Sequence, residues 1–241
     1  MNLPVLKHLN NEGTRLEKGT PRADVSLQQF QQQIDTLVRL GYPDLLAMDS
    51  SPFRAALDPL TRHLPAGASA EGDPAGGALP FVVVINTPLA PARATLSLIE
   101  RRGQRAIERL YPKEPEHFRP IEVVKLPLGH AYLLLDIDRG GDTLNVTPDD
   151  ALVLIDARRR SPLTLEEGVA LLTHFPEFLQ PNNCFSTLGS RCGDRRVPAF
   201  WLSQGRPKLG WCWAGNPHSW LGSASCGARS SAVELHTLCG N

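Results

Sequence analysis

The stretch Phe81-Val82-Val83-Val84-Ile85 decides the fold. It is a continuous apolar run, rich in β-branched residues and too short for a free-standing helix, which predicts a buried strand. Residues 131–137 repeat this signature with Tyr-Leu-Leu-Leu-Asp-Ile after Ala131. The middle of the chain therefore contains two strands of a sheet that is covered by other elements.

Helical patterns lie before these strands. Apolar residues recur at helical spacing from Leu27 to Val38, with Ser26 placed to cap the helix and Gly41 placed to end it. A second short helix is expected with Ser51 as N-cap and Pro52 at its first position. The two form a helical hairpin.

Further helices are predicted between and after the strands. One runs from about residue 91 to residue 102 and is closed by Gly103. Another opens with Thr147, Pro148 and two acids, and Thr164 forms a capping box with Glu167 for the next, which stops before Pro176. Beyond residue 182 the pattern favours strands, at 184–188, 197–203 and 209–213, with a hairpin turn at 203–207.

This order of elements predicts an α+β fold: a mixed sheet with packed helices, an N-terminal helical hairpin and a strand-rich C-terminal part. We expect a flexible arm over residues 1–24, the hairpin over 25–64 packed on the main domain, and a flexible linker over 65–79. The main domain covers residues 80–229, and a tail covers 230–241.

The composition argues against two classes of binding partner, nucleic acids and anionic membranes. Lysine and arginine number 25, as do aspartate and glutamate, so no overall field is available to hold nucleic acid or an anionic membrane. The start of the chain lacks the order of a signal peptide, and no apolar run approaches bilayer length, which predicts a cytoplasmic protein. The 5 cysteines argue against a disulfide framework. A small-molecule substrate is the expected partner, and the oligomeric state is left open.

Residues 183–226 are the candidate functional region, because all 4 tryptophans of the chain lie there. An aromatic ligand surface is one interpretation; the other is that tryptophans fill the core of a small sheet. By strand alternation, Trp211 and Trp213 share one face and Cys212 takes the other. The candidate ligand-binding residues are Arg191, Arg195, Arg196, Trp211, Trp213, Asn216 and Trp220.

The three arginines lie with Asp194 in a glycine-bounded loop. Guanidinium forks suit carboxylate or phosphate groups, so this loop is a candidate anion site. The alternative is an arginine–aspartate network that pins the loop to the sheet.

The candidate catalytic residues are Cys192, Asp194 and His218. Flanking arginines are expected to lower the pKa of the Cys192 thiol and so expose a nucleophilic thiolate. Such a nucleophile needs a base, for which His218 and His174 are the candidates. His174 has an alternative role, binding the last carbonyls of its helix.

A metal site is a rival interpretation. Cys192, Cys212, Cys226 and His218 could supply a tetrahedral set of ligands to a transition metal such as zinc. The spacing holds no C-x-x-C pair, and single cysteines are often small buried apolar residues.

S-adenosylmethionine is the candidate organic cofactor. Its sulfonium cation suits tryptophan faces and its carboxylate suits arginine. The leading hypothesis is therefore a small-molecule enzyme, a transferase such as an S-adenosylmethionine-dependent methyltransferase. The alternatives are a Cys/His metal enzyme and a non-catalytic binding module with a Trp/Arg surface.

Two motifs carry a resemblance. Residues 189–198, Gly-Ser-Arg-Cys-Gly-Asp-Arg-Arg-Val-Pro, and residues 207–222, Pro-Lys-Leu-Gly-Trp-Cys-Trp-Ala-Gly-Asn-Pro-His-Ser-Trp-Leu-Gly, resemble a bacterial family catalogued as a domain of unknown function. The similarity runs from about residue 27 to residue 229. It implies a cytoplasmic bacterial protein with one continuous domain, and it implies no activity, cofactor or catalytic residue.

Overall fold

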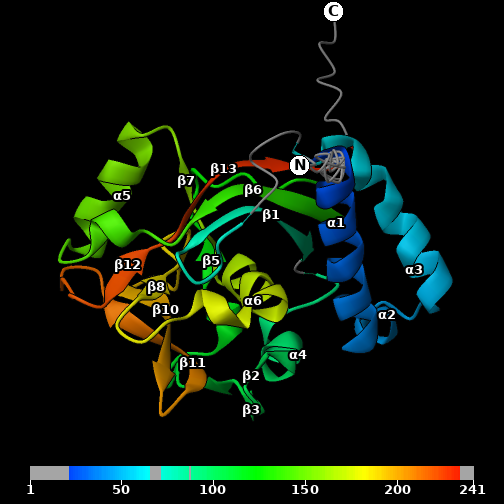
Figure 1. Ribbon diagram of the computed structural model, residues 1–241. Coiled ribbons are helices and arrows are strands. Elements are labelled where there is room, and N and C mark those ends of the chain that lie inside the picture. The colour runs from blue at the N-terminus through cyan, green and yellow to red at the C-terminus, as the bar shows by residue number, and fades with distance from the viewer. Residues whose placement is uncertain (1–21, 66–71, 87, 234–241) are drawn as a thin grey trace, which may run out of the picture.

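The computed structural model describes residues 22–65, 72–86 and 88–233 (Figure 1). Within them, 6 α-helices and 13 strands, which include a mixed five-stranded sheet, confirm the predicted α+β class and its strand-rich C-terminal part. The α-helices are α1 (Arg22–Arg39), α2 (Tyr42–Leu45), α3 (Ser50–Leu57), α4 (Ala92–Thr95), α5 (Pro148–Ala157) and α6 (Leu165–His174). The short 3-10 helices are η1 (Asp58–His63), η3 (Leu96–Leu98), η4 (Pro115–His117), η5 (Gly141–Thr143) and η6 (Pro176–Phe178).

The first sheet has four antiparallel strands in the order β1-β6-β13-β7. They are β1 (Ala78–Ile85), β6 (Ala131–Asp138), β13 (Ser225–Ser230) and β7 (Ser161–Pro162). The two apolar runs that predict buried strands are thus neighbours, with Val83 opposite Leu133.

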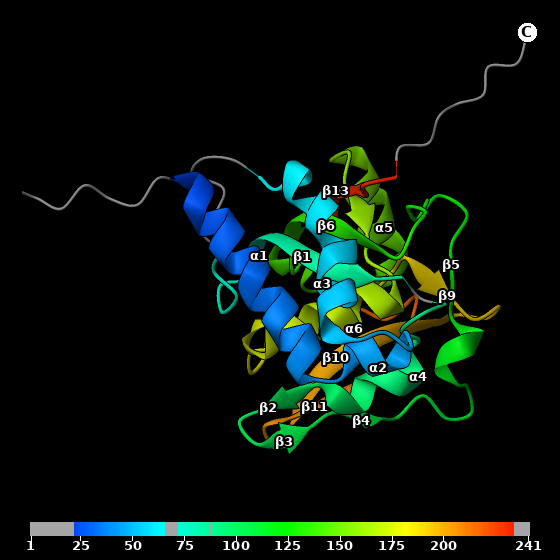
Figure 2. The ribbon, with the colours of Figure 1, turned by 90° about the vertical axis from the view of Figure 1, so that its right-hand side faces the viewer.

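Both faces of β1 are covered, which explains why its sequence does not alternate. Phe81 and Val83 pack with the N-terminal helices, whereas Val82 and Val84 belong to the main core. Figure 2 shows α1 and α3 in front of this outer face of β1 and β6, with α2 below them beside α4. Phe30 of α1 and Phe53 of α3 are fully buried there.

The second sheet is mixed, in the order β12-β8-β10-β11-β4. Its strands are β12 (Leu221–Ser223), β8 (Cys184–Ser186), β10 (Arg196–Ser203), β11 (Arg206–Trp213) and β4 (Ile107–Glu108). The outer pairs β12–β8 and β11–β4 are parallel and the inner pairs are antiparallel. Two small sheets pair β2 (Glu100–Arg101) with β3 (Gln104–Arg105), and β5 (Arg119–Pro120) with β9 (Ser190–Arg191).

Helix α6 lies between the two sheets (Figure 1). The predicted capping box is present: Thr164 Oγ1 accepts from the backbone N–H of Glu167, and the Glu167 carboxylate accepts from that of Thr164. At Gly168 an added Cβ would lie 2.5 Å from the Phe200 ring on β10, so glycine lets the helix approach the second sheet. On the opposite side, His174 Nε2 lies 3.0 Å from the Val83 carbonyl of β1.

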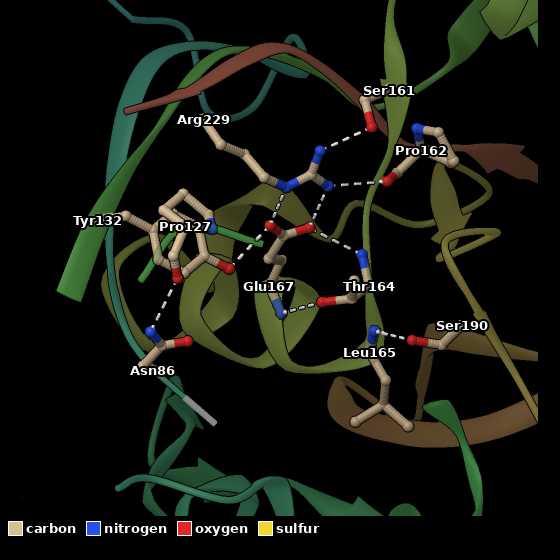
Figure 3. A network of polar contacts seen from close by, with 10 residues as sticks. All are labelled: Asn86, Pro127, Tyr132, Ser161, Pro162, Thr164, Leu165, Glu167, Ser190 and Arg229. Atoms are coloured by element: carbon tan, nitrogen blue, oxygen red, sulfur yellow. Dashed lines mark hydrogen bonds and ion pairs between the residues drawn. The ribbon is translucent and has the colours of Figure 1, made fainter. Parts of the chain in front are cut away.

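A buried ion pair joins α6 to the first sheet (Figure 3). Arg229 of β13 donates from Nε and Nη2 to the two oxygens of Glu167, at 2.6 and 2.7 Å. Glu167 also accepts from Tyr132 Oη at 2.8 Å, and Arg229 Nη1 donates to Ser161 Oγ at 2.6 Å. Because every charged atom of the pair has a partner, this network acts as a structural joint.

The start of the chain differs in detail from the sequence prediction. Ser26 lies inside α1 and not at its cap, and its hydroxyl donates to the Pro65 carbonyl at 2.7 Å. Gly41, with a φ of 81°, follows the end of α1 as expected. The N-cap of α3 is Asp49 and not Ser51. Residues 1–21 of the predicted arm lie outside the described residues.

The predicted helix over residues 91–102 is wrong. One α-helical turn, α4, passes into η3 and then into the β2–β3 hairpin. Arg102 and Gly103 both have positive φ, 51° and 77°, and form the tight turn of that hairpin. Gly103 therefore marks a strand turn and not a helix end.

Part of the predicted linker over 65–79, residues 66–71, lies outside the described residues. Its second half forms a turn in which the backbone N–H groups of Gly77 and Ala78 donate to the Asp73 carbonyl. Arg139 donates to the carbonyls of Ala75 and Gly76, both at 3.0 Å. A buried guanidinium thus supplies the contacts that the small side chains of this segment lack.

Of the predicted tail, Ser230 still belongs to β13, and residues 234–241 lie outside the described residues. Among the described helices, none combines the length and the apolar character needed to cross a membrane.

Candidate functional site

A cavity of about 380 Å³ lies against the β10–β11 hairpin and the loop that follows it. We call it the tryptophan cavity. It is lined by Ala199, Trp201, Trp211, Cys212, Trp213, Asn216, His218, Trp220 and Leu221. Ligand cavities commonly measure about 300–1,000 Å³ and combine apolar walls with a few polar groups, and this one has that composition.

Strand pairing explains how the walls are built. Trp201 is opposite Lys208 and Ala199 is opposite Gly210, so these two β10 residues share the Cys212 face of β11. An added Cβ at Gly210 would lie 2.2 Å from the Trp201 ring, so glycine makes room for the indole. Trp201 is not among the ligand-binding residues predicted above, although its place in the hairpin pattern could have indicated this role.

Trp211 and Trp213 share the other face, as alternation predicts. Their ring centroids are 4.9 Å apart in an edge-to-face arrangement. The Arg196 guanidinium carbon lies 4.6 Å from the Trp211 ring centroid and 5.0 Å from that of Trp213. Arg196 is therefore a cation–π partner of both rings, which restrains their orientation.

His218 and Asn216 are the polar side chains of the cavity that could orient a ligand. The His218 ring centroid lies 5.4 Å from that of Trp220. His218 Nε2 is buried and has no hydrogen-bond partner among the described residues. Leaving a buried polar atom without a hydrogen bond costs about 1–3 kcal/mol of folding free energy. A ligand group that bonds to Nε2 would recover part of this cost.

Asp194 is the centre of the arginine loop. Its carboxylate accepts from the backbone and the Nη1 of Arg196, both atoms within hydrogen-bond distance, and lies 3.3 Å from Lys113 Nζ. The backbone N–H of Arg196 is the main reason why the pKa of Asp194 is lowered. Asp194 is thus engaged in holding the loop.

The other two arginines have separate partners. Arg191 Nη1 donates to the carbonyls of Leu188 and Ser190, at 2.6 and 3.0 Å. Arg195 lies 3.6 Å from Asp149 and has an exposed side chain. The arrangement matches the alternative interpretation, an arginine–aspartate network that pins the loop.

The expectation of a lowered pKa for Cys192 is not met. Burial raises the pKa of this thiol, and Asp194, whose Oδ1 accepts from Sγ at 3.1 Å, raises it further. The neighbour of the sulfur is thus a carboxylate and not a guanidinium. A protonated thiol is a weak nucleophile.

The two candidate bases have different surroundings. His174 is held against Val83 as described above, and burial lowers its pKa to about 4. His218 lines the tryptophan cavity, whereas Cys192 does not belong to the cavity lining.

The four predicted zinc ligands do not form one site. Cys226 lies on β13 in the first sheet, Cys212 lies on β11 in the second, and Cys192 contacts Asp194. Burial raises the pKa of Cys212 to about 11 and that of Cys226 to about 12, so both thiols are protonated in the metal-free chain at neutral pH. Among the described residues, no three His, Cys, Asp or Glu side chains gather as a metal-ligand group.

A smaller cavity, of about 280 Å³, lies between α1 and α6. Its walls include Gln29, Gln32 and Gln33 of α1, His174 of α6, and Gly72. Gly72 follows directly on residues outside the described part of the chain. The lining of the tryptophan cavity, by contrast, lies entirely within the described residues.

The fold and the cavity together define an α+β protein with an aromatic candidate ligand site. A family model described as a family of unknown function (DUF5701) matches residues 36–232, and the chain belongs to this family. This confirms the resemblance carried by the two sequence motifs. Neither the search of curated proteins nor the search of solved structures gave a match.

Proposed function

We propose that this chain binds a small molecule in the tryptophan cavity. The observation that carries the proposal is the pairing of aromatic walls with the unpartnered, buried Nε2 of His218. A ligand with a flat or apolar body would pack on Trp201 and Trp220, and a polar group on it would bond to His218. The volume of about 380 Å³ suits a body of one or two rings.

The rival is an interaction surface for a protein partner. Interface anchors of this kind are exposed before binding, since the partner must reach them. Of the four tryptophans, all of which are described, Trp213 is exposed, whereas Trp201, Trp211 and Trp220 are half-buried in the cavity. This distribution favours a ligand that enters a recess.

If the chain is an enzyme, the activity that we propose for this cavity is methyl transfer from S-adenosylmethionine. Its support is the set of indole faces, which attract a sulfonium cation. His218 would then be the candidate base. The three arginines expected to hold the cofactor carboxylate are engaged elsewhere, so methyl transfer depends on another anion site.

Isothermal titration calorimetry with 3-phenylpropanamide, a neutral aromatic probe, tests the binding proposal. We expect binding to the natural chain and a loss of at least about tenfold in Trp220→Ala, because an aromatic wall contributes more than about 1.4 kcal/mol. Tyr111→Ala is the matched control, since Tyr111 has an exposed ring and contacts the region through its backbone carbonyl. Equal affinities in Trp220→Ala and Tyr111→Ala contradict the proposal.

Native mass spectrometry with S-adenosylmethionine tests methyl transfer separately. Retention of one cofactor molecule by the natural chain, and its loss in Trp220→Ala, is the expected result. If the cofactor does not bind while the neutral probe does, methyl transfer is excluded as the use of this cavity and the binding proposal stands.

A further inference from the structure

A second cavity adjoins the tryptophan cavity. It measures about 730 Å³, and Trp201 and Trp220 line both. Its lining also includes Arg101, Arg102 and Gln180, and we call it the arginine cavity. We infer that it holds the acidic group of a ligand whose flat part lies in the tryptophan cavity.

Arg101 is the residue that carries the inference. Its side chain is only 3% exposed, which is unusual for an arginine. Nη2 donates to Glu177 Oε2 at 2.8 Å, but Nε has no partner among the described residues. A guanidinium held in this way has an N–H to give, and its planar fork matches a carboxylate or a phosphate.

The local charge favours an anion. Glu177 is shared between Arg101 and Arg102, whose Nε lies 3.3 Å from Glu177 Oε1. One carboxylate thus faces two guanidinium groups, which leaves one positive charge in excess. No acidic residue is among the described residues that line the arginine cavity.

The fold explains why Arg101 is in place before any ligand arrives. It belongs to β2, and the β2–β3 hairpin is closed by the tight turn at Arg102 and Gly103. The backbone N–H of Ala106 donates to the Ile99 carbonyl at 2.9 Å and holds the base of the hairpin. A side chain already fixed by its fold loses little entropy when it binds an anion.

The ligand class that follows is a flat, apolar molecule with a carboxylate or phosphate group. The inference rests on the proposed function, because the shared walls Trp201 and Trp220 have to contact the same ligand as Arg101. It replaces the anion site expected at the loop of residues 189–196.

Calorimetric titration with a matched pair of probes tests it. 3-Phenylpropionate carries the carboxylate, and 3-phenylpropanamide has the same shape without the charge. We expect the carboxylate to bind the natural chain at least about tenfold more tightly, and Arg101→Gln to abolish this difference and leave the affinity for the amide unchanged. Arg54→Gln is the control with the same change of charge, because Arg54 pairs with Asp35 on the surface; it should change neither affinity.

The outcomes separate the two proposals. Equal affinities of the two probes for the natural chain, or a loss in Arg54→Gln as large as in Arg101→Gln, refute the acid-group inference and leave the binding proposal intact. If neither probe binds the natural chain, the proposed function fails and the inference fails with it. If Arg101→Gln does not fold, the double variant Arg101→Gln/Glu177→Gln removes both charges of the pair, and the same preference should be lost.

Discussion

Replacement of Arg229 by methionine should destabilise the protein strongly, because it breaks the buried pair that joins α6 to the first sheet. Glu167 has no exposed surface and the Arg229 side chain is 7% exposed. In the variant, the Glu167 carboxylate keeps its bonds from Tyr132 and from the backbone of Thr164, and it loses both guanidinium bonds.

The expected loss is about 3–5 kcal/mol in the free energy of unfolding, since a buried charge is left without its partner. For a chain of this size, that loss lowers Tm by roughly 6–20 °C. Arg54→Met is the comparison, because Arg54 and Asp35 form a pair with 39% and 64% exposed side chains. A surface pair of this kind contributes less than about 1 kcal/mol.

Urea unfolding followed by circular dichroism gives the free energies for Arg229→Met, Glu167→Gln and the double variant. The double variant should be more stable than the sum of the single losses predicts, with a coupling energy of about 1–3 kcal/mol. A loss in Arg229→Met no larger than in Arg54→Met, or additive losses in the cycle, would refute the assignment of this pair as a structural joint.

Three further predictions concern other sites. Burial raises the pKa of Glu166 from 4.5 to about 7, so the folded state holds this proton more tightly than the unfolded chain. The natural chain should therefore lose up to about 3 kcal/mol of stability as pH rises from 4.5 through 7, and Glu166→Gln should show a smaller loss in urea titrations at pH 5 and pH 8. Gly168→Ala should cost about 1–3 kcal/mol by thermal unfolding, because its methyl group meets the Phe200 ring at 2.5 Å; an unchanged or raised Tm contradicts this contact. Asp194→Asn should speed the alkylation of Cys192 by iodoacetamide at pH 7.5, measured by peptide mass spectrometry, because the carboxylate that raises the thiol pKa is removed; an unchanged or slower reaction would contradict this role of Asp194.

Local signals in the sequence predicted much of the fold. The capping box at Thr164 and Glu167, and the cap at Thr147, are formed by side chains within three residues of each other, and the structure contains both. The run at 81–85 identified a strand because burial on both faces leaves a continuous apolar sequence.

The failures arose where distant contacts decide the structure. Residues 91–102 have a helical pattern, yet the positive φ at Arg102 and Gly103 turns the chain into a hairpin. Adjacent arginines were expected to act together, but alternation and loop hydrogen bonds direct Arg191, Arg195 and Arg196 to different partners.

The candidate site was predicted in part for the same reason. The tryptophans, Asn216 and His218 are close in sequence, and they do line one cavity. Arg101 lies far from them along the chain, in a segment expected to be helical. Its position beside Trp201 follows only from the assembled sheets.

The central claim is that the tryptophan cavity is a ligand site, and a crystal structure after soaking with 3-phenylpropanamide tests it most directly. We predict the phenyl ring against Trp201 and Trp220 with the amide within hydrogen-bond distance of His218 Nε2. An empty cavity in crystals where the probe binds elsewhere, or a Trp220 ring that fills the cavity, would contradict the account.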